Sequence, residues 1–476
     1  VDQPSSIDDQ LDVVQITPDH IRSNGTLHST PFAGIAELID NAVDSNAKTV
    51  KISTRNIKDH ETSADEQIIY VVDDGSGMDR KETLGAILVG HSVKRGDIGT
   101  IGQFGNGLKS GSMRIGETML LVTKKDEEFT LLLISLKYLE AKQTIKCYAP
   151  CISLRPNMNE ELVRLDLPEE SVEKHDHALS IMLQYSPFKT KEDLFEFAAT
   201  CFDGDSGTCV VLSDLKRQEN GRYEMKYSEK SGDFTVDGRG TTKTDVLSRF
   251  LQRLYLKPKI SICIQGRMVR MIDPLRQLVD VRWDYLAPKG LEEFSNREVS
   301  KLDAAMKRLT TNIGQKTNEE RVKFKHRQSC ENDFPPEKLK ALDREIRMVQ
   351  EEKRKLEEQK VVIGKRREEI QSKKLGGDLR VYVGIDLASR HVPRVMFYTN
   401  GRRIMTKDLD RTAKKKMELL GVVCIIDIPS TLLPPSQSRE NFEMPGELGF
   451  LTSKINKIAK NYFLHADPKY KRAEFW

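Results

Sequence analysis

Residues 32–44 read FAGIAELIDNAVD, a short apolar stretch that also carries a glutamate, two aspartates and an asparagine. Thr30-Pro31 precedes it, and threonine at an N-cap followed by proline at the first helical position predicts a helix that runs to about Ser45. Glu37 and Asn41 stand four residues apart, so they share one face of this helix. Carboxylates and amides on so apolar a helix are costly unless water or a polar partner meets them.

That polar face has two interpretations. A carboxylate such as Glu37 near a metal-bound nucleotide can orient or deprotonate water, and the side-chain oxygen of Asn41 suits Mg²⁺. The plainer alternative is a helix whose polar stripe, widened by Asp40 and Asp44, simply faces solvent.

Three further pieces follow along the chain. Residues 73–78 (DDGSGM) come directly after the β-rich run Ile68–Val72, so the carboxylate of Asp73 at a strand end can accept the exocyclic amine of adenine. Gly75 and Gly77 would allow the backbone to approach the ring closely, although an ordinary turn has the same composition.

Residues 102–111 (GQFGNGLKSG) form a glycine-rich segment that opens a helix. Its exposed N–H groups, the helix N-terminus and the charge of Lys109 suit a phosphate group, whereas a flexible surface loop is the alternative. Gly207-Thr208 opens a strand, Cys209–Leu212, and indicates nothing by itself.

The remaining pattern predicts two domains of mixed α and β structure. We expect an N-terminal arm over residues 1–15, a first domain over 16–235 and a second over 236–476, divided at a Gly- and Asp-rich stretch. Strands are expected at Thr49–Ser53 and Ile68–Val72, with a hairpin of Thr118–Thr123 and Phe129–Leu136. The second domain is expected to open with a helix and a strand, and further strands follow: Thr244–Leu254 and Lys259–Ile264, then Leu379–Asp386, Arg394–Tyr398 and Val422–Ile428.

Residues 290–375 differ from the rest of the second domain. Two rows repeat every seven residues with an offset of three, which predicts a coiled-coil seam. The rows are Leu339, Ile346, Lys353, Lys360 and Arg367, and Leu342, Val349, Leu356, Ile363 and Ile370. Pro335-Pro336 separates this arm from an upstream one, so we expect an inserted antiparallel hairpin. Its positive charges outnumber its negative ones, which suits either DNA contact or a merely solvated coiled coil.

Composition bounds the class of protein. The net charge of +4 over 476 residues excludes a histone-like polycation. Seven scattered cysteines argue against a disulfide framework or a structural zinc site. The longest apolar runs fall far short of the roughly 18 residues of a membrane span, so no membrane association is expected.

In order and spacing, the four pieces resemble the N, G1, G2 and G3 boxes of the GHKL ATPases, which include gyrase, MutL and histidine kinases. The amino-acid sequences of the motifs are most similar to those of the microrchidia (MORC) ATPases. The similar segments are Phe32–Asp44, Asp73–Met78, Gly102–Gly116, Leu254–Pro258 (LYLKP) and Ile262–Val269. The resemblance implies an α+β fold: a GHKL (Bergerat) α/β sandwich ATPase domain, then an S5-like transducer domain with the inserted coiled-coil hairpin. A CW-type zinc finger pattern is not seen in this sequence.

The resemblance also implies roles for residues. Glu37 would be the general base, Asn41 the Mg²⁺ ligand and Asp73 the adenine reader, with Thr208 in support. The other nucleotide-binding positions would be Gly75, Gly77, Met78, Ser92, Lys94, Gly102, Gly105, Asn106, Gly107 and Lys109. The family's transducer lysine is replaced: the run PSQSRENF (435–442) puts Arg439 there, as Hsp90-type relatives use an arginine for the γ-phosphate. An ordinary surface arginine is the alternative.

The leading hypothesis is therefore an ATP- and Mg²⁺-dependent dimerising clamp that hydrolyses ATP slowly. The resemblance implies a nuclear homodimer that acts on DNA or chromatin in compaction and gene silencing. The alternative is a structural DNA-binding protein that uses ATP as an assembly ligand with negligible turnover. A histidine kinase, a topoisomerase and a MutL-type repair protein fit less well, because the chain lacks their further motifs.

Overall fold

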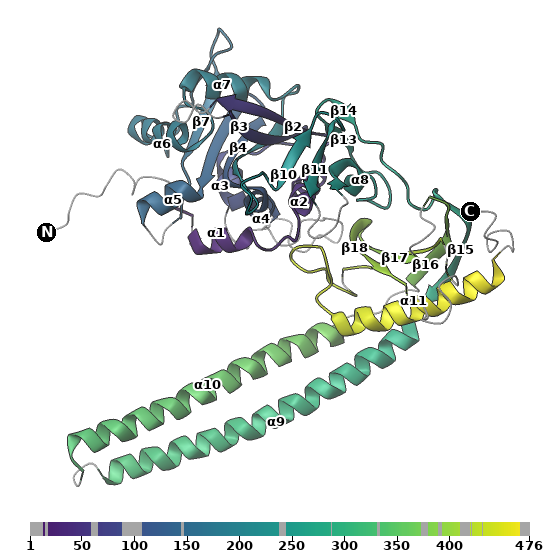
Figure 1. The fold of residues 1–476 in the computed structure, drawn as a ribbon. Helices are drawn as coiled ribbons and strands as arrows, with labels where there is room; N and C mark the ends of the chain where they lie inside the picture. Colours follow the sequence, from purple (N-terminus) through teal and green to yellow (C-terminus); the bar gives the residue numbers. More distant parts are fainter. Residues whose placement is uncertain are drawn as a thin grey trace.

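The computed structural model describes residues 13–14, 18–58, 65–87, 107–143, 147–237, 244–286, 288–330, 334–372, 379–388, 393–409, 419, 421–430 and 432–466. Two α+β domains lie side by side, and a pair of long helices projects from the second (Figure 1). This agrees with the α+β class that the sequence predicts.

The first domain is built on a nine-stranded sheet with the order β14-β13-β2-β3-β9-β4-β5-β7-β8. Its pairs are antiparallel except β13 with β2. The strands are β2 (Thr49–Lys58), β3 (Asp65–Asp73), β4 (Gly116–Lys125), β5 (Glu128–Ser135), β7 (Cys151–Pro156), β8 (Leu162–Arg164), β9 (Gly207–Leu215), β13 (Ser261–Ile264) and β14 (Arg267–Met268). The predicted strands after Thr49 and Ile68 and the hairpin of β4 and β5 are confirmed.

Helices and short strands surround this sheet. The helices are α1 (Pro18–Asn24), α2 (Pro31–Asp44), α3 (Arg80–Ile87), α4 (Gly107–Ile115), α5 (Leu136–Lys142), α6 (Val172–Tyr185), α7 (Lys191–Thr200) and α8 (Leu247–Leu251). The short strands are β1 (Val13–Val14), β6 (Cys147–Tyr148), β10 (Met225–Ser228), β11 (Asp233–Asp237) and β12 (Thr244–Val246).

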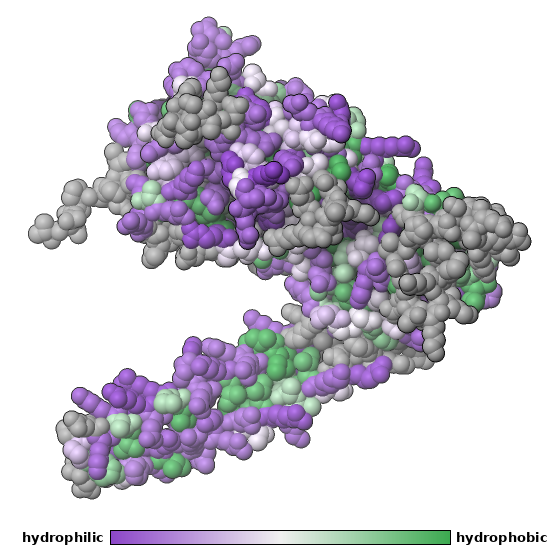
Figure 2. All heavy atoms as spheres, in the orientation of Figure 1, coloured by the Kyte–Doolittle hydropathy of each residue, from purple (hydrophilic) through white to green (hydrophobic). Residues whose placement is uncertain are grey.

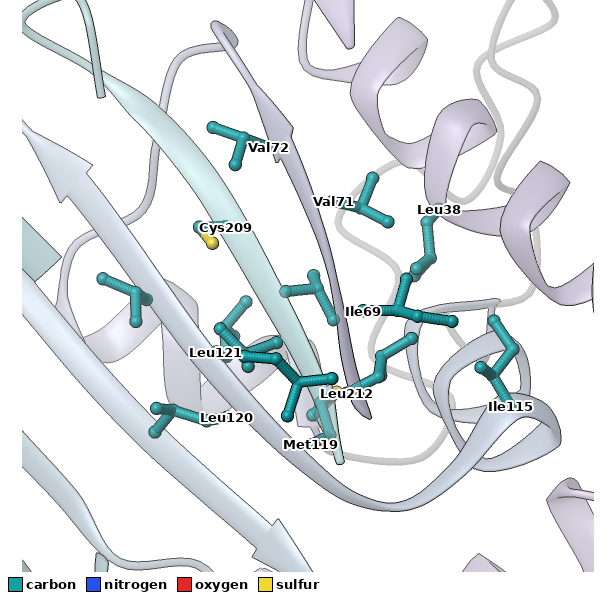
Figure 3. Close-up of a cluster of buried hydrophobic side chains, with 14 of the residues drawn as sticks. Leu38, Ile69, Val71, Val72, Ile115, Met119, Leu120, Leu121, Cys209 and Leu212 are labelled. Atoms are coloured by element: carbon teal, nitrogen blue, oxygen red, sulfur yellow. The ribbon is translucent and has the colours of Figure 1, made fainter. Parts of the chain in front are cut away.

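The core of the first domain lies between the sheet and its covering helices. Figure 3 shows Leu38 of α2 and Ile115 of α4 beside Ile69 and Val71 of β3, all of them buried. Because these two helices lie on the same sheet face, their polar residues are brought together at one end of that core.

The predicted start of the second domain is wrong in two respects. The expected strand Lys259–Ile264 is β13, which pairs in parallel with β2 and so extends the first sheet. The expected helix Thr244–Leu254 is a short strand, β12, followed by α8, whose Leu247 and Leu251 join the first core. The change in composition near residue 236 predicted a domain boundary, but the pairing of β13 with β2, about 200 residues earlier in the chain, keeps this segment in the first domain.

The second domain is a five-stranded sheet with the order β15-β16-β19-β17-β18. Its strands are β15 (Leu278–Leu286), β16 (Leu379–Asp386), β17 (Arg394–Thr399), β18 (Arg402–Asp408) and β19 (Val422–Asp427). Helix α11 (Pro445–His465) packs on one face through Leu451 and Ile455. The three strands expected in this region are confirmed.

Two long helices, α9 (Pro288–Ser329) and α10 (Pro336–Ser372), leave the sheet between β15 and β16. They run antiparallel, because ion pairs link Lys316 to Glu352, Lys323 to Glu345 and Arg327 to Asp343. The predicted seam is the inner row of α10: its described members are all buried or half-buried, and Ile346 and Val349 are the most buried. The helical hairpin is thus confirmed, whereas its supercoiling stays a prediction.

Figure 2 shows the helix pair as a largely hydrophilic surface with apolar residues gathered in places along it. Within the described residues, no helix is long and apolar enough to cross a membrane. Six cysteines are free thiols: Cys151, Cys201, Cys209, Cys263, Cys330 and Cys424.

Candidate functional site

Helix α2 begins as its sequence predicts. The N-cap Thr30 accepts a hydrogen bond from the backbone N–H of Ala33 at 3.3 Å, and Pro31 occupies the first turn. Two carboxylates of the polar stripe do not face solvent, since Glu37 is 1% exposed and Asp40 0%, whereas Asn41 and Asp44 are half-buried. The interpretation of α2 as an ordinary surface helix is therefore wrong, and its polar residues need partners inside the protein.

Glu37 has the properties of a general base. Burial raises the pKa of Glu37 to about 7, against the opposing effect of Arg439. Among the described residues, its Oε1 atom has no hydrogen-bond partner, and neither has Nδ2 of Asn41 one turn along. A carboxylate that titrates near neutral pH, with one oxygen uncommitted, can accept a proton from a bound water.

The N-terminus of α4 lies directly against this pair. A Cβ atom built on Gly107, the first residue of α4, would come within 2.7 Å of Glu37 Oε2 and 3.6 Å of Asn41 Oδ1. A Cβ on Gly111 would meet the carbonyl oxygen of Gly34 at 2.7 Å, so glycines allow α2 and α4 to pack in contact. A helix N-terminus beside a carboxylate and an amide oxygen suits a phosphate held with a divalent cation.

Asp73 ends β3 beside Thr208, its partner on β9. Burial raises the pKa of Asp73 to about 7, and its Oδ1 accepts a hydrogen bond from the Gly75 N–H at 2.8 Å. Gly77 adopts a φ of +63°, and a Cβ there would lie 1.9 Å from the Lys124 carbonyl oxygen. The turn is thus closely packed, as the predicted adenine-binding box requires.

Thr123 is a neighbour of this turn that the sequence prediction missed. Its Oγ1 accepts a hydrogen bond from the Met78 N–H at 2.8 Å and donates to the Gly207 carbonyl at 3.1 Å. Thr123 therefore joins the turn at residues 73–78 to the strand that carries Thr208. Only the pairing of β4 with β9 reveals this, because a threonine in a strand carries no signal of its own.

The predicted lid is only partly described. Ser92, Lys94, Gly102, Gly105 and Asn106 lie outside the described residues. Lys109 is within them: it is buried on α4, and its Nζ donates to the carbonyl of Ile87 at 3.0 Å.

Arg439 reaches the same helix from the second domain. Its Nη1 lies 2.8 Å from Asp40 Oδ2 and 3.5 Å from Glu37 Oε2. The residue is 5% exposed, so it is not the ordinary surface arginine of the alternative interpretation. Burial opposes its charge, but the carboxylates of Glu37 and Asp40 outweigh burial and raise the pKa of Arg439, which keeps it cationic.

The loop that carries Arg439 is held on both sides. Arg439 has a φ of +52°, a conformation that an arginine seldom adopts. Next to it, the Glu440 carboxylate accepts from the Ser29 N–H at 2.8 Å and also from the Ser29 hydroxyl. A strained residue fixed by its neighbours at a polar site is typical of functional positions.

Comparison with known proteins agrees with this geometry. Residues 28–160 match the family described as histidine kinase-, DNA gyrase B-, and HSP90-like ATPase. The first domain is therefore a GHKL-type ATPase domain, as its buried glutamate, asparagine and facing helix N-terminus indicate.

Similarity to particular proteins extends further along the chain. The chain is 26% identical to ATPase morc-1 of Caenorhabditis elegans over 473 residues, which are 97% of this chain and 52% of that protein. It is 29% identical to human MORC family CW-type zinc finger protein 1, over 95% of this chain and 44% of that protein. Human ATPase MORC2 is 32% identical over 55% of this chain and 25% of its own length. The chain is thus similar to MORC-family ATPases along most of its length, and it spans about half or less of these relatives' length.

Proposed function

We propose that this chain binds ATP with Mg²⁺ between α2 and α4 and hydrolyses it. The observation that carries the proposal is Glu37: a buried carboxylate with a pKa of about 7 and a free oxygen, beside Asn41 and the start of α4. The family model over residues 28–160 supports the same class of substrate.

Each side chain has a defined task in this reaction. Glu37 accepts a proton from the attacking water, and Asn41 would hold Mg²⁺ through its side-chain oxygen. The metal would supply positive charge to the phosphate oxygens. Asp73 would accept the adenine amine, and Arg439, which lies 3.5 Å from Glu37, would stabilise charge on the γ-phosphate.

The wider proposal is a homodimeric, ATP-gated clamp that acts on DNA or chromatin in the nucleus, in compaction and gene silencing. In this scheme the N-terminal arm pairs two protomers when nucleotide is bound, and the basic helix pair α9–α10 contacts DNA. The long exposed hairpin and its excess of positive charge support the DNA contact.

Replacing Glu37 by alanine tests the hydrolytic step. We expect phosphate release to fall by about a hundredfold or more, because water loses its base, while affinity for a non-hydrolysable ATP analogue changes little. Glu82→Gln, at an exposed carboxylate of α3, is the control and should retain wild-type release. Analogue binding without measurable release in the wild type would instead favour the alternative, a structural DNA-binding protein that uses ATP as an assembly ligand.

Light scattering tests the clamp. The mass of the chain should double on addition of the analogue with Mg²⁺, and Asn41→Ala should stay monomeric because it loses the proposed metal ligand. A mass that ignores bound analogue would contradict nucleotide gating.

A further inference from the structure

The LYLKP motif, Leu254–Pro258, forms one of the contacts between the two domains. The β17–β18 hairpin turns at Asn400 and Gly401, whose φ values are 52° and 74°. The tip of this hairpin docks on the motif: the Leu256 N–H donates to the Gly401 carbonyl at 2.7 Å, and the Arg403 N–H to the Leu254 carbonyl at 2.8 Å. These backbone contacts fix the residue between them, Arg402, opposite Tyr255.

Arg402 and Tyr255 both point to one carboxylate of the nucleotide-site helix. The Tyr255 hydroxyl donates to Asp40 Oδ1 at 2.7 Å, and Arg402 Nε donates to Asp40 Oδ2 at 3.0 Å. Arg439 Nη1 donates to the same Oδ2 at 2.8 Å. Asp40 is fully buried, and its three donors come from the LYLKP motif, the hairpin of β17 and β18, and the loop after β19.

The buried charges at this junction balance. Asp40 and Glu37 are opposed by Arg402 and Arg439, and His28 adds no charge near neutral pH because burial and these arginines lower its pKa to about 4. Removal of one partner from a buried ion cluster leaves an uncompensated charge. Without Asp40, two arginines would face the single carboxylate of Glu37.

We propose that Asp40 is a positioning residue for ATP hydrolysis, which holds Arg439 of the second domain beside Glu37 without letting the two pair fully. Arg402 and Tyr255 hold Asp40 in turn. Loss of the Asp40 carboxylate releases Arg439 onto Glu37, whose oxygens are then committed to the guanidinium and no longer accept a proton from water. The inference rests on the proposed hydrolytic function of Glu37.

Asp40→Asn tests the inference, because it keeps the shape of the side chain and removes its charge. We expect kcat to fall by about tenfold or more, while the Kd of the ATP analogue stays within about threefold of wild type. Arg402→Met should lower kcat in the same way, and Arg402→Lys should restore part of it. Asp386→Asn is the matched control: Asp386 is also buried and accepts a hydrogen bond from Arg394 at 2.7 Å, with Arg253 4.0 Å away, but it lies on β16 of the second sheet.

A second readout separates this inference from the proposed function. Analogue binding should slow hydrogen exchange in the hairpin 394–408 of the wild type and not in Asp40→Asn, whether or not ATP is turned over. Equal protection in both proteins would overturn the inference, as would a wild-type kcat in Asp40→Asn. A parallel loss of kcat and analogue affinity would also overturn it, because Asp40 would then only maintain the fold. A wild type without turnover would refute the proposed hydrolysis, and the exchange data alone would then decide whether Asp40 links the domains.

Discussion

Two buried carboxyl groups share an unusual property at the scale of single residues. Burial raises the pKa of both Glu37 and Asp73 to about 7, although they lie on different elements. Groups whose pKa is shifted this far towards neutrality are concentrated at functional sites. The first cause of the raised pKa is the same for both groups, since each carboxylate is buried.

Nucleotide affinity should depend on pH through Asp73. The adenine amine needs an ionised acceptor, and Asp73 becomes protonated as pH falls through 7, so analogue affinity should weaken below that value by up to about tenfold per pH unit. Calorimetric titrations between about pH 6 and pH 8 measure this. Asp73→Asn should flatten the profile.

Asp74→Asn is the control for that experiment. Asp74 is the adjacent carboxylate, but it accepts from the Lys48 and Thr49 N–H groups instead of facing the proposed ring site. Its variant should keep the wild-type slope, and an unchanged slope in Asp73→Asn would show that another group titrates.

The crossing of α2 and α4 is the decisive feature at the scale of elements. Glycines at Gly34 and Gly111 bring each backbone to the other's carbonyl, and this closeness places Gly107 against Glu37. The electrostatic effect of a helix N-terminus is confined to its first turn, so the proposed nucleotide site depends on how closely α2 and α4 approach each other.

Gly111→Ala should therefore damage both stability and binding. The added Cβ would lie 2.7 Å from the Gly34 carbonyl oxygen, and the forced separation should cost about 1–3 kcal/mol of unfolding free energy. Denaturant unfolding and an analogue titration measure the two effects. Gly85→Ala on α3 is the control, since its Cβ would meet nothing within 4 Å and alanine favours a helix by about 1 kcal/mol. Wild-type stability in Gly111→Ala would refute the close-packing argument.

At the scale of the whole molecule, the helix pair is an insertion into a β-hairpin. Leu286 at the end of β15 pairs directly with Leu379 at the start of β16, so the strand ends meet whether or not α9 and α10 are present. The ion pairs along the helices lie at the surface, where each contributes about 0–1 kcal/mol. Val299 and Leu302 at the base of α9 also pack against the core of the second sheet, so the base of the pair contributes to the stability of that sheet, whereas the ion pairs contribute little.

Replacing residues 287–378 by an Asn-Gly turn should leave a folded ATPase. We expect phosphate release within about twofold of the intact chain, because α9 and α10 pack mainly against each other and the contacts described above for the nucleotide site involve neither helix. Affinity for double-stranded DNA should fall, because the basic surface is removed, and a shift assay at low salt measures it. The intact chain at raised salt is the control for electrostatic binding. Undiminished DNA affinity would place the DNA contact elsewhere.

The sequence alone determined those elements whose signals are local. The cap Thr30-Pro31 predicted α2, two apolar runs separated by Lys124–Glu128 predicted the hairpin of β4 and β5, and the seven-residue seam predicted the inner face of α10. The order and spacing of the segments rich in glycine and carboxylates predicted a GHKL ATPase by resemblance, which the family match over residues 28–160 supports, while the roles of the individual residues stay predictions. Hydrogen bonding and side-chain periodicity of this kind act between near neighbours, so they can be read from the chain itself.

Only the tertiary structure decided which distant residues meet. Local composition suggested that the strand Lys259–Ile264 belonged to the second domain, yet the observed strand β13 pairs with β2 of the first sheet. Asp40 is 362 residues from Arg402 and 399 from Arg439, and neither contact has a local signature. Burial and pairing across such separations follow from how the two domains dock, because the free energy of a buried charge depends on all the groups that surround it in space.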